Sequence, residues 1–401
     1  MLLSKLTTTL QSLNSDAFIR FSEYMQSDYF HAPKAAKILF DYIAPLYPEF
    51  EESLLQSEII ARANKELPTA NKQAKAGSAI LEAFDFFIAL EKWKKNPVDV
   101  ALCRLQALKD LKLKKQYEAE LEYAERLLDK EEKNLDNFYY RHQLTEIIFN
   151  GFDAKLNRTK ENDLFPVIKT LDEFYAVKKL RYLCEIVVRK QVLGISFPEQ
   201  EIDALLKMAE PFNNPHFPYV YLFVNVYQMH TSATFEQSRY YHQLIKRFVS
   251  KHESEPLPES IKECMAYSIN WCIYWFNKGY EETSAEYIWW TELKIKHTLL
   301  LAHDLILPIA FQNIVVQAFS CGKDPKWIRQ FIDAYSPHLP AEHRKNDISY
   351  ANGFYYYAIK DYKEAGRHFN NAEIKDDKIF NAVNRRWKWM SDYEDNPKDI
   401  V

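Results

Sequence analysis

Apolar residues recur at helical spacing along nearly the whole chain, and this pattern constrains the fold more than any other feature. Leu2, Leu6 and Leu10 step by four, and the segment 69–95 has the pattern of one long helix that opens at Thr69. No alternating run bounded by Asn-Gly or Asp-Gly marks a strand. Glycine weakens helix interiors, and only 7 of the 401 residues are Gly. The sequence therefore predicts an all-α protein.

Helices in the second half of the chain are expected to come in pairs. The pairs are 217–229 with 234–252, 259–278 with 282–302, 307–320 with 325–337, and 347–359 with 361–374. Upstream of them, 163–194 is expected to form one long helix or two helices nearly end to end. We expect a helical N-terminal region over 1–160 and a repeat region over 161–401. Alternatively, the boundary between these two regions lies within 194–217, where Gly194 and several prolines cluster.

The stretch GFYYYAIKDYKEAGRHFNNA, residues 353–372, has the most specific spacing in the sequence. Gly353 comes three residues before Tyr356, and after a turn Ala365 and Phe369 follow four residues apart. The two small side chains allow helices to cross closely, and the two rings fill the space beside the crossing. This spacing resembles the tetratricopeptide repeat, a helix–turn–helix unit. The resemblance implies that such hairpins stack into an irregular right-handed α-solenoid.

An earlier pair fits the same spacing less well. Tyr274, Tyr280, Thr283 and Tyr287 fall at the offsets of Tyr356, Tyr362, Ala365 and Phe369. However, Trp271 and Trp290 stand where two small residues are usual. We therefore expect this pair either to be splayed or to bury its tryptophans against an additional element.

Three longer stretches give the chain a second likeness. They are SDYFHAPKAAKILFDYIAPLYPEF, LDEFYAVKKLRYLCEIVVRKQ and YSINWCIYWFNKGY. With these stretches the chain resembles a group of uncharacterised all-helical bacterial proteins. The resemblance covers most of the chain and implies a helical fold, but it implies no activity, substrate or site.

Charge and cysteine content exclude several classes of function. A formal charge of −4, from 52 basic and 56 acidic side chains, provides no global field for nucleic acid or anionic lipid. The 5 cysteines are too few and too scattered for a disulfide framework. The N-terminus lacks the regions of a signal peptide, and the most apolar tract, 297–319, is interrupted by Asp304 and Pro308. We therefore expect a protein of the reducing cytoplasm that does not enter a membrane.

Motifs of catalysis and cofactor binding are missing from the sequence. It contains no Gly-rich phosphate loop, GxSxG elbow, HExxH or CxxC. The 11 His are scattered, and His297 and His303, six residues apart, fall on different helix faces. Cys184 and Cys272 lie on apolar helix faces, where cysteine is usually a small buried hydrophobe. We expect no enzyme activity, no cofactor and no metal site.

Three aromatic residues near the C-terminal end form the first candidate binding surface. In a tetratricopeptide-like hairpin the first helix lines the concave face, and the resemblance implies that Tyr350, Phe354 and Tyr357 project into this groove. Tyr356 is expected to turn into the core. Aromatic side chains are enriched at the centres of interfaces. The alternative is that a neighbouring helix covers these residues and makes them ordinary core.

A second candidate surface is the basic and aromatic segment NRRWKWM at 384–390. It contains Arg385, Arg386, Trp387, Lys388 and Trp389. Such interleaving suits single-stranded nucleic acid, because cations hold phosphate and aromatic rings stack on bases. The alternative, favoured by the negative net charge, is that the tryptophans form the buried stripe of a terminal helix whose basic residues face water. We therefore rank nucleic acid below protein as a partner.

Taken as a set, these features predict a binding protein. We expect a helical-repeat scaffold that holds a peptide or a partner protein on a concave, aromatic-lined surface. One alternative is a regulator that senses a peptide or small ligand in its groove and passes the change to a second partner. The other is a helical-repeat nucleic-acid binder that uses 384–390.

Overall fold

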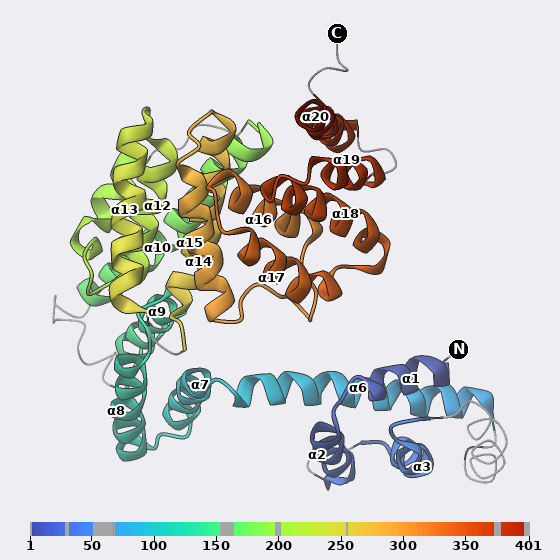
Figure 1. Cartoon of the computed structure of the whole chain (residues 1–401). Coiled ribbons are helices and arrows are strands. Elements are labelled where there is room, and N and C mark those ends of the chain that lie inside the picture. Colours follow the sequence, from blue (N-terminus) through green and yellow to red (C-terminus); the bar gives the residue numbers. More distant parts are fainter. Residues whose placement is uncertain are drawn as a thin grey trace. The chain divides into compact units, whose positions relative to one another are not determined.

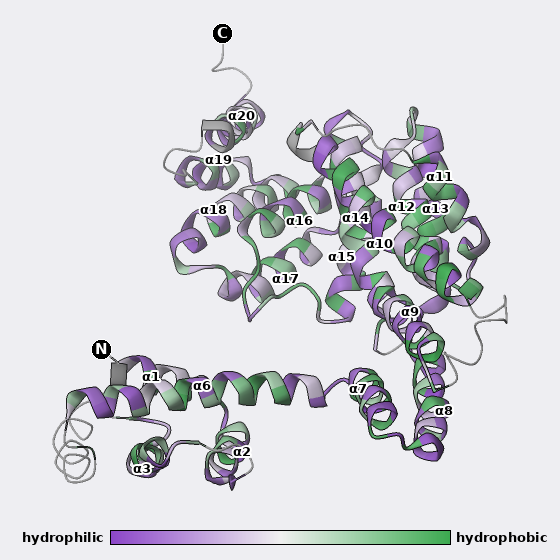
Figure 2. Ribbon diagram, turned by 180° about the vertical axis from the view of Figure 1, so that it is seen from behind, coloured by the Kyte–Doolittle hydropathy of each residue, from purple (hydrophilic) through white to green (hydrophobic). Residues whose placement is uncertain are grey.

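A computed structural model shows that the regular structure of the described residues is helical, which confirms the predicted all-α class (Figure 1). The described residues are 2–28, 32–50, 67, 69–152, 164–196, 202–253, 256–372 and 378–396. Apart from an isolated β-bridge between Ala302 and Leu305, they contain no strand. In Figure 2 hydrophobic and hydrophilic residues alternate along the helices, as in amphipathic helices that bury one face.

The chain divides into two compact units. Unit 1 comprises Met1–Lys130 and Asn150–Asn157, and unit 2 comprises Glu131–Phe149 and Arg158–Val401. Each unit has its own hydrophobic core.

Unit 1 is built around one long helix. Its helices are α1 (Leu2–Gln11), α2 (Ser15–Gln26), α3 (Lys34–Ile43), α6 (Ala70–Lys94), α7 (Pro97–Asp110) and α8 (Lys114–Lys130). The long helix predicted from the sequence is α6, and it is capped as expected by Thr69, whose side chain accepts a hydrogen bond from the backbone N–H of Lys72. Its buried Phe84 and Phe87 pack against Phe21 of α2, with ring centroids 5.8 and 5.3 Å apart.

Unit 2 contains the predicted helix pairs. Its helices are α9 (Leu135–Phe149), α10 (Leu164–Leu193), α11 (Asp203–Ala209), α12 (Pro218–Thr231), α13 (Phe235–His252), α14 (Glu259–Asn277), α15 (Thr283–Lys296), α16 (Pro308–Ser320), α17 (Pro325–Tyr335), α18 (Ala341–Ala358), α19 (Tyr362–Asn371) and α20 (Lys378–Asp395). The four predicted pairs are α12 with α13, α14 with α15, α16 with α17, and α18 with α19. The stretch expected as one helix or two is a single 30-residue helix, α10. Because α9 packs along α10, unit 2 begins before residue 160, and 194–217 lies inside it.

The crossing of α18 and α19 shows the close approach expected from its small residues. A Cβ added to Gly353 would lie 2.5 Å from the ring of Phe369, which is itself fully buried. Ala365 of α19 is also fully buried. A side chain at 353 would therefore collide with a ring that has no free space to move into.

Replacing Ala365 by phenylalanine should overpack this crossing and lower the free energy of unfolding by about 1–3 kcal/mol. The same replacement at Lys363, which is exposed on the same helix, should cost less than about 0.5 kcal/mol. Urea unfolding of the two variants beside the wild type measures the difference. Equal losses at both positions would show that the register of this hairpin is wrong.

Trp271 and Trp290 are buried against polar side chains of α13, which corresponds to the second of the two alternatives expected from the sequence, burial against an additional element. The Nε1 of Trp290 donates to His242 Nε2 at 2.9 Å, and the Nε1 of Trp271 donates to Ser238 Oγ at 2.6 Å. Trp275 Nε1 donates to the same hydroxyl at 3.2 Å, and the His242 ring stacks on Trp271 with centroids 4.1 Å apart. The pair α14–α15 can bury these large residues because α13 supplies an acceptor for each indole N–H.

The N-terminus of α14 is capped by a residue distant in sequence. Pro258 precedes the helix and provides no side-chain cap. Instead, the Glu132 carboxylate accepts hydrogen bonds from the backbone N–H groups of Glu259 at 3.0 Å and Ser260 at 3.2 Å. An anion is favourable there because the first amides of a helix have no partner within the helix. Glu132 thus ties the connection between α8 and α9 to α14.

Candidate functional site

The aromatic residues expected to line a groove lie mostly in the core. Tyr350 is 5% exposed and Phe354 is fully buried, while Tyr357 is half-buried. The Phe354 ring lies 5.3 Å from Phe319 of α16 and 4.9 Å from Trp387 of α20, measured between centroids. The expectation that Tyr350 and Phe354 line a groove is therefore wrong. Residues of α16 and α20 cover Phe354, and the Tyr350 ring lies against Phe354 and against Phe369 of α19.

Tyr356, which the sequence assigned to the core, is half-buried. Its ring stacks on His368 of α19, with centroids 5.1 Å apart and planes 10° from parallel. Burial lowers the pKa of His368 and so favours its neutral form beside the ring. Tyr356 therefore contributes to the contact between α18 and α19 at the edge of the core.

The basic and aromatic segment lies on α20, where its two tryptophans point to different sides. Trp387 packs against the core formed by Phe354 and Phe369, whereas Trp389 is 68% exposed. Arg385 and Arg386 are exposed and Lys388 is half-buried. The expected buried tryptophan stripe therefore holds for Trp387 alone. Only one of the two indoles is available for stacking on a base.

Helix α10 exposes apolar side chains along the face opposite to the core. Leu164, Ile168, Leu171, Tyr175 and Tyr182 are separated by four, three, four and seven residues, so they share one side of the helix. Each of them is between 47% and 53% exposed. We call these five residues the outer stripe. They are not among the binding residues expected from the sequence.

The opposite face of α10 is buried in unit 2. Its core residues are Ala176, Val177, Leu180, Leu183, Cys184 and Val188. The Cys184 thiol lies against the backbone carbonyl of Phe223 in α12, and burial raises the pKa of this thiol. A protonated, buried cysteine acts as a packing residue rather than as a nucleophile. The inner face thus holds α10 in place while the outer stripe stays uncovered by the described helices.

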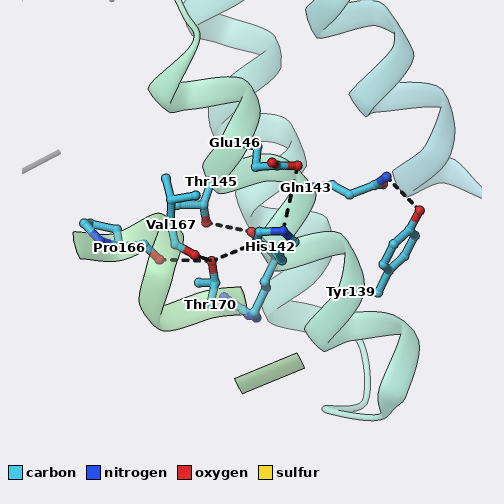
Figure 3. A network of polar contacts seen from close by, with 9 residues as sticks. Tyr139, His142, Gln143, Thr145, Glu146, Pro166, Val167 and Thr170 are labelled. Atoms are coloured by element: carbon cyan, nitrogen blue, oxygen red, sulfur yellow. Dashed lines mark hydrogen bonds and ion pairs between the residues drawn. The ribbon is translucent and has the colours of Figure 1, made fainter. Parts of the chain in front are cut away.

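Helix α9 runs along the N-terminal half of α10 and positions it. Figure 3 shows His142 of α9 directed at Thr170 of α10, with Nδ1 and Oγ1 3.3 Å apart. The Thr170 hydroxyl also bonds the carbonyl of Pro166 at 2.9 Å within α10. Farther along, the rings of Tyr139 and Phe174 lie 5.3 Å apart. These contacts hold the rotation of α10 about its axis and therefore the direction of the outer stripe.

A pocket of about 500 Å³ lies at the C-terminal end of the outer stripe. It is lined by Arg181, Tyr182, Glu185, Ile186 and Arg189 of α10 and by Tyr267 of α14. Its lining side chains combine two aromatic rings and an aliphatic wall with a charged rim. Such a surface can receive an apolar side chain and hydrogen-bond the polar groups around it.

The charged groups of this pocket are held in pairs. Arg181 Nε donates to Glu263 at 2.8 Å, and Arg189 Nε donates to Glu185 at 2.7 Å. The Tyr267 hydroxyl donates to Glu185 at 3.3 Å. The hydrogen bond to Glu263 raises the pKa of Arg181, and burial raises the pKa of Tyr267, so one stays charged and the other stays protonated at neutral pH. The lining therefore offers hydrogen-bond donors, a carboxylate and apolar walls.

Two lysines border the outer stripe at its middle. Lys178 lies over the ring of Phe174 at 5.1 Å, and Lys179 lies over the ring of Tyr175 at 5.4 Å. The Lys179 ammonium also donates to the Tyr175 hydroxyl at 3.0 Å. Among the described residues neither lysine forms an ion pair with a carboxylate. The stripe therefore carries positive charge beside its aromatic residues.

In the part of the chain that the structure describes, no group of three or more His, Cys, Asp or Glu side chains is arranged to hold a metal ion. None of the described helices is both long enough and apolar enough to cross a membrane. Comparison of the chain with models of protein families, with curated proteins and with solved structures gave no match. The two resemblances noted in the sequence thus rest on residue patterns alone.

Proposed function

We propose that this chain is a cytoplasmic, tetratricopeptide-like helical-repeat scaffold that binds a protein or peptide and acts by binding rather than by catalysis. The observation that carries the proposal is the outer stripe of α10. Large contiguous apolar patches on the surface of a protein commonly mark the place where another molecule binds. The stripe also ends at a pocket, which provides a place for an anchoring side chain.

The repeat character of the proposal is supported by how successive pairs pack. At two of the three steps between successive pairs, the first helix contacts the first helix of the next pair, as α12 contacts α14 and α16 contacts α18. At the remaining step the second helix of one pair, α15, contacts the first helix of the next, α16. Such contacts between neighbouring units are what a solenoid of hairpins requires. The close crossing at Gly353 supports the same interpretation for the last pair.

The partner surface proposed here differs from the one expected from the sequence. Tyr350 and Phe354 are covered, whereas the leucine, isoleucine and tyrosine residues of the outer stripe are not. Leu171 lies at the centre of the exposed part of α10, with the aromatic Tyr175 one turn away. Charged side chains border this apolar centre, which is the usual anatomy of a protein interface.

Replacing Ile168 and Leu171 together by glutamate should remove partner binding, because it places two charges in the apolar centre of the surface. The full-length variant and the wild type are immobilised, and the proteins they capture from an extract of the native cell are identified by mass spectrometry. Ile309→Glu is the matched control, since Ile309 is a 61% exposed apolar residue on α16, outside the stripe.

The double variant should melt within a few degrees of the wild type, because its positions are exposed. Proteins captured by the wild type and by Ile309→Glu but lost on the double variant are the expected result. An identical set of captured proteins on all three forms would reject α10 as the binding surface.

A further inference from the structure

We infer that the outer stripe of α10 binds the outer stripe of a second copy of this chain, with the two α10 helices antiparallel. The inference rests on the proposed function, because it names the protein partner of the same surface. It is carried by the exposure of the stripe, by its register and by the charges beside it.

The spacing of the stripe is that of a helix-pairing seam. Continued along α10, steps of four and three residues give the series Leu164, Ile168, Leu171, Tyr175, Lys178, Tyr182, Glu185 and Arg189. This alternation is the spacing by which two helices pack side by side. A two-fold axis at the height of Ala176 and Val177 maps the series onto itself in the reverse direction. The seam is therefore compatible with an isologous contact.

This arrangement places complementary side chains opposite one another at the centre. Leu171 faces the partner's Tyr182, and Tyr175 faces the partner's Lys178. The first contact joins an aliphatic side chain to an aromatic ring. The second places an ammonium group near a phenol ring, as Lys179 already does within one copy. The symmetry forms each contact twice.

Charges beside the seam agree with the same register. Asp172 and Lys179 lie on one side of the stripe, seven residues apart, and the two-fold axis brings Asp172 of each copy near the partner's Lys179. Asp172 is exposed, and among the described residues it forms no ion pair. Two reciprocal ion pairs would thus form between groups that lack such partners within one chain.

A large exposed aromatic ring, that of Phe165, lies on the same side of the outer stripe as Asp172 and Lys179. Phe165 is 67% exposed, more than any residue of the outer stripe. The antiparallel register places it near the partner's Ile186, which lines the pocket at the end of α10. An apolar ring of one copy would therefore cover the aliphatic wall of the other copy's pocket.

A parallel pair is disfavoured by like charges. Equivalent residues would then face each other, so Lys178 would meet the partner's Lys178 and Arg189 would meet the partner's Arg189. Like charges directly opposite one another repel. In the antiparallel arrangement the basic C-terminal part of α10 instead faces the apolar N-terminal part, which also carries Asp172.

The first test is the mass of the full-length protein in solution. Multi-angle light scattering after gel filtration should give twice the mass of one chain for the wild type and for Ile309→Glu. Leu171→Glu should be monomeric with an unchanged far-ultraviolet circular dichroism spectrum, because its position is exposed. A monomeric wild type, or a dimer that persists in folded Leu171→Glu, would overturn the inference.

The second test exchanges the charges beside the seam. Asp172→Lys should weaken dimerisation roughly tenfold in sedimentation equilibrium, because two ion pairs become two repulsions. Adding Lys179→Asp to the same chain should restore the wild-type dissociation constant, since the pairs re-form with reversed sign. Failure of the second change to restore dimerisation would reject the antiparallel register.

The two proposals fail in different ways. If the wild type is monomeric but Ile168→Glu with Leu171→Glu still removes captured proteins, self-pairing is rejected and the stripe binds a segment of another protein. If the wild type is a dimer through the stripe and the extract yields only the chain itself, the second copy is its partner. If neither association depends on the stripe, both proposals are rejected.

Discussion

Replacing Phe354 by alanine should lower the free energy of unfolding by about 3–5 kcal/mol, because it removes a fully buried ring from the core of unit 2. The ring touches Phe319, Phe369 and Trp387, which belong to three different helices. A cavity at this point therefore loosens α16, α19 and α20 at once. Chemical denaturation monitored by circular dichroism measures the loss.

Ile359→Ala provides the matched control for this variant. Ile359 follows α18 directly and is 44% exposed, so its truncation should change stability by less than about 1 kcal/mol. Should Phe354→Ala prove as mild as the control, the ring would be accessible in solution. The groove expected from the sequence would then have to be reconsidered.

Lowering the pH from 7 to 5 should destabilise the protein through two buried histidines. Burial lowers the pKa of His230 to about 4, and burial together with the charges of Lys246, Arg239 and His230 lowers the pKa of His242 to about 3. The unfolded chain takes up these protons near pH 6.5, whereas the folded protein does not. The contribution of these two histidines to the free energy of unfolding is therefore fully present above pH 6.5. It is lost progressively as the pH falls from 6.5 towards their folded-state pKa values of about 4 and about 3. Between pH 7 and pH 5 each histidine should cost about 2 kcal/mol.

His242→Gln tests this origin of acid sensitivity. Glutamine does not titrate, so the stability lost between pH 7 and pH 5 should be roughly halved relative to the wild type. The variant will be less stable at pH 7, because the Trp290 N–H depends on the imidazole. His216→Gln, at an exposed position, should retain the full wild-type loss. The same pH dependence in all three forms would contradict the assignment.

Local patterns were sufficient to predict the helices. Thr69 and the periodic residues after it specified α6, and paired periodic segments separated by short turns specified the hairpins from α12 to α19. These signals lie within a few residues of the structure they describe, so no knowledge of distant contacts was needed. The small residues at Gly353 and Ala365 likewise predicted a crossing that involves only two adjacent helices.

The burial of particular side chains could not be predicted, because it depends on contacts between residues that are distant in sequence. Phe354 is buried because Phe319 and Trp387 reach it from α16 and α20, and nothing in its own helix specifies that cover. Trp290 can be buried because His242, although it is 48 residues away in sequence, accepts a hydrogen bond from the indole N–H. A helix pattern indicates which residues share a face, but it does not indicate whether another helix covers that face.

The outer stripe was missed for a different reason. Apolar residues occupy both the inner and the outer face of α10, so the helix does not show the contrast that distinguishes a buried side from a wet one. The outer stripe can be recognised by the regular spacing of Ile168, Leu171, Tyr175 and Tyr182. The same helix also carries a second set of apolar residues, which face the core. A search for two separate apolar faces on one long helix would have identified it.

Glu132 determines at which residue a fragment that contains the helices of unit 2 should begin. It precedes α9, yet its carboxylate holds the first amides of α14, 127 residues later. A fragment that begins at Leu135 would contain every helix of unit 2, but it would leave the amides of Glu259 and Ser260 without that acceptor. A fragment that begins at Glu131 retains it. The useful boundary for dissecting this protein is therefore set by one carboxylate in a connecting segment and not by the start of the next helix.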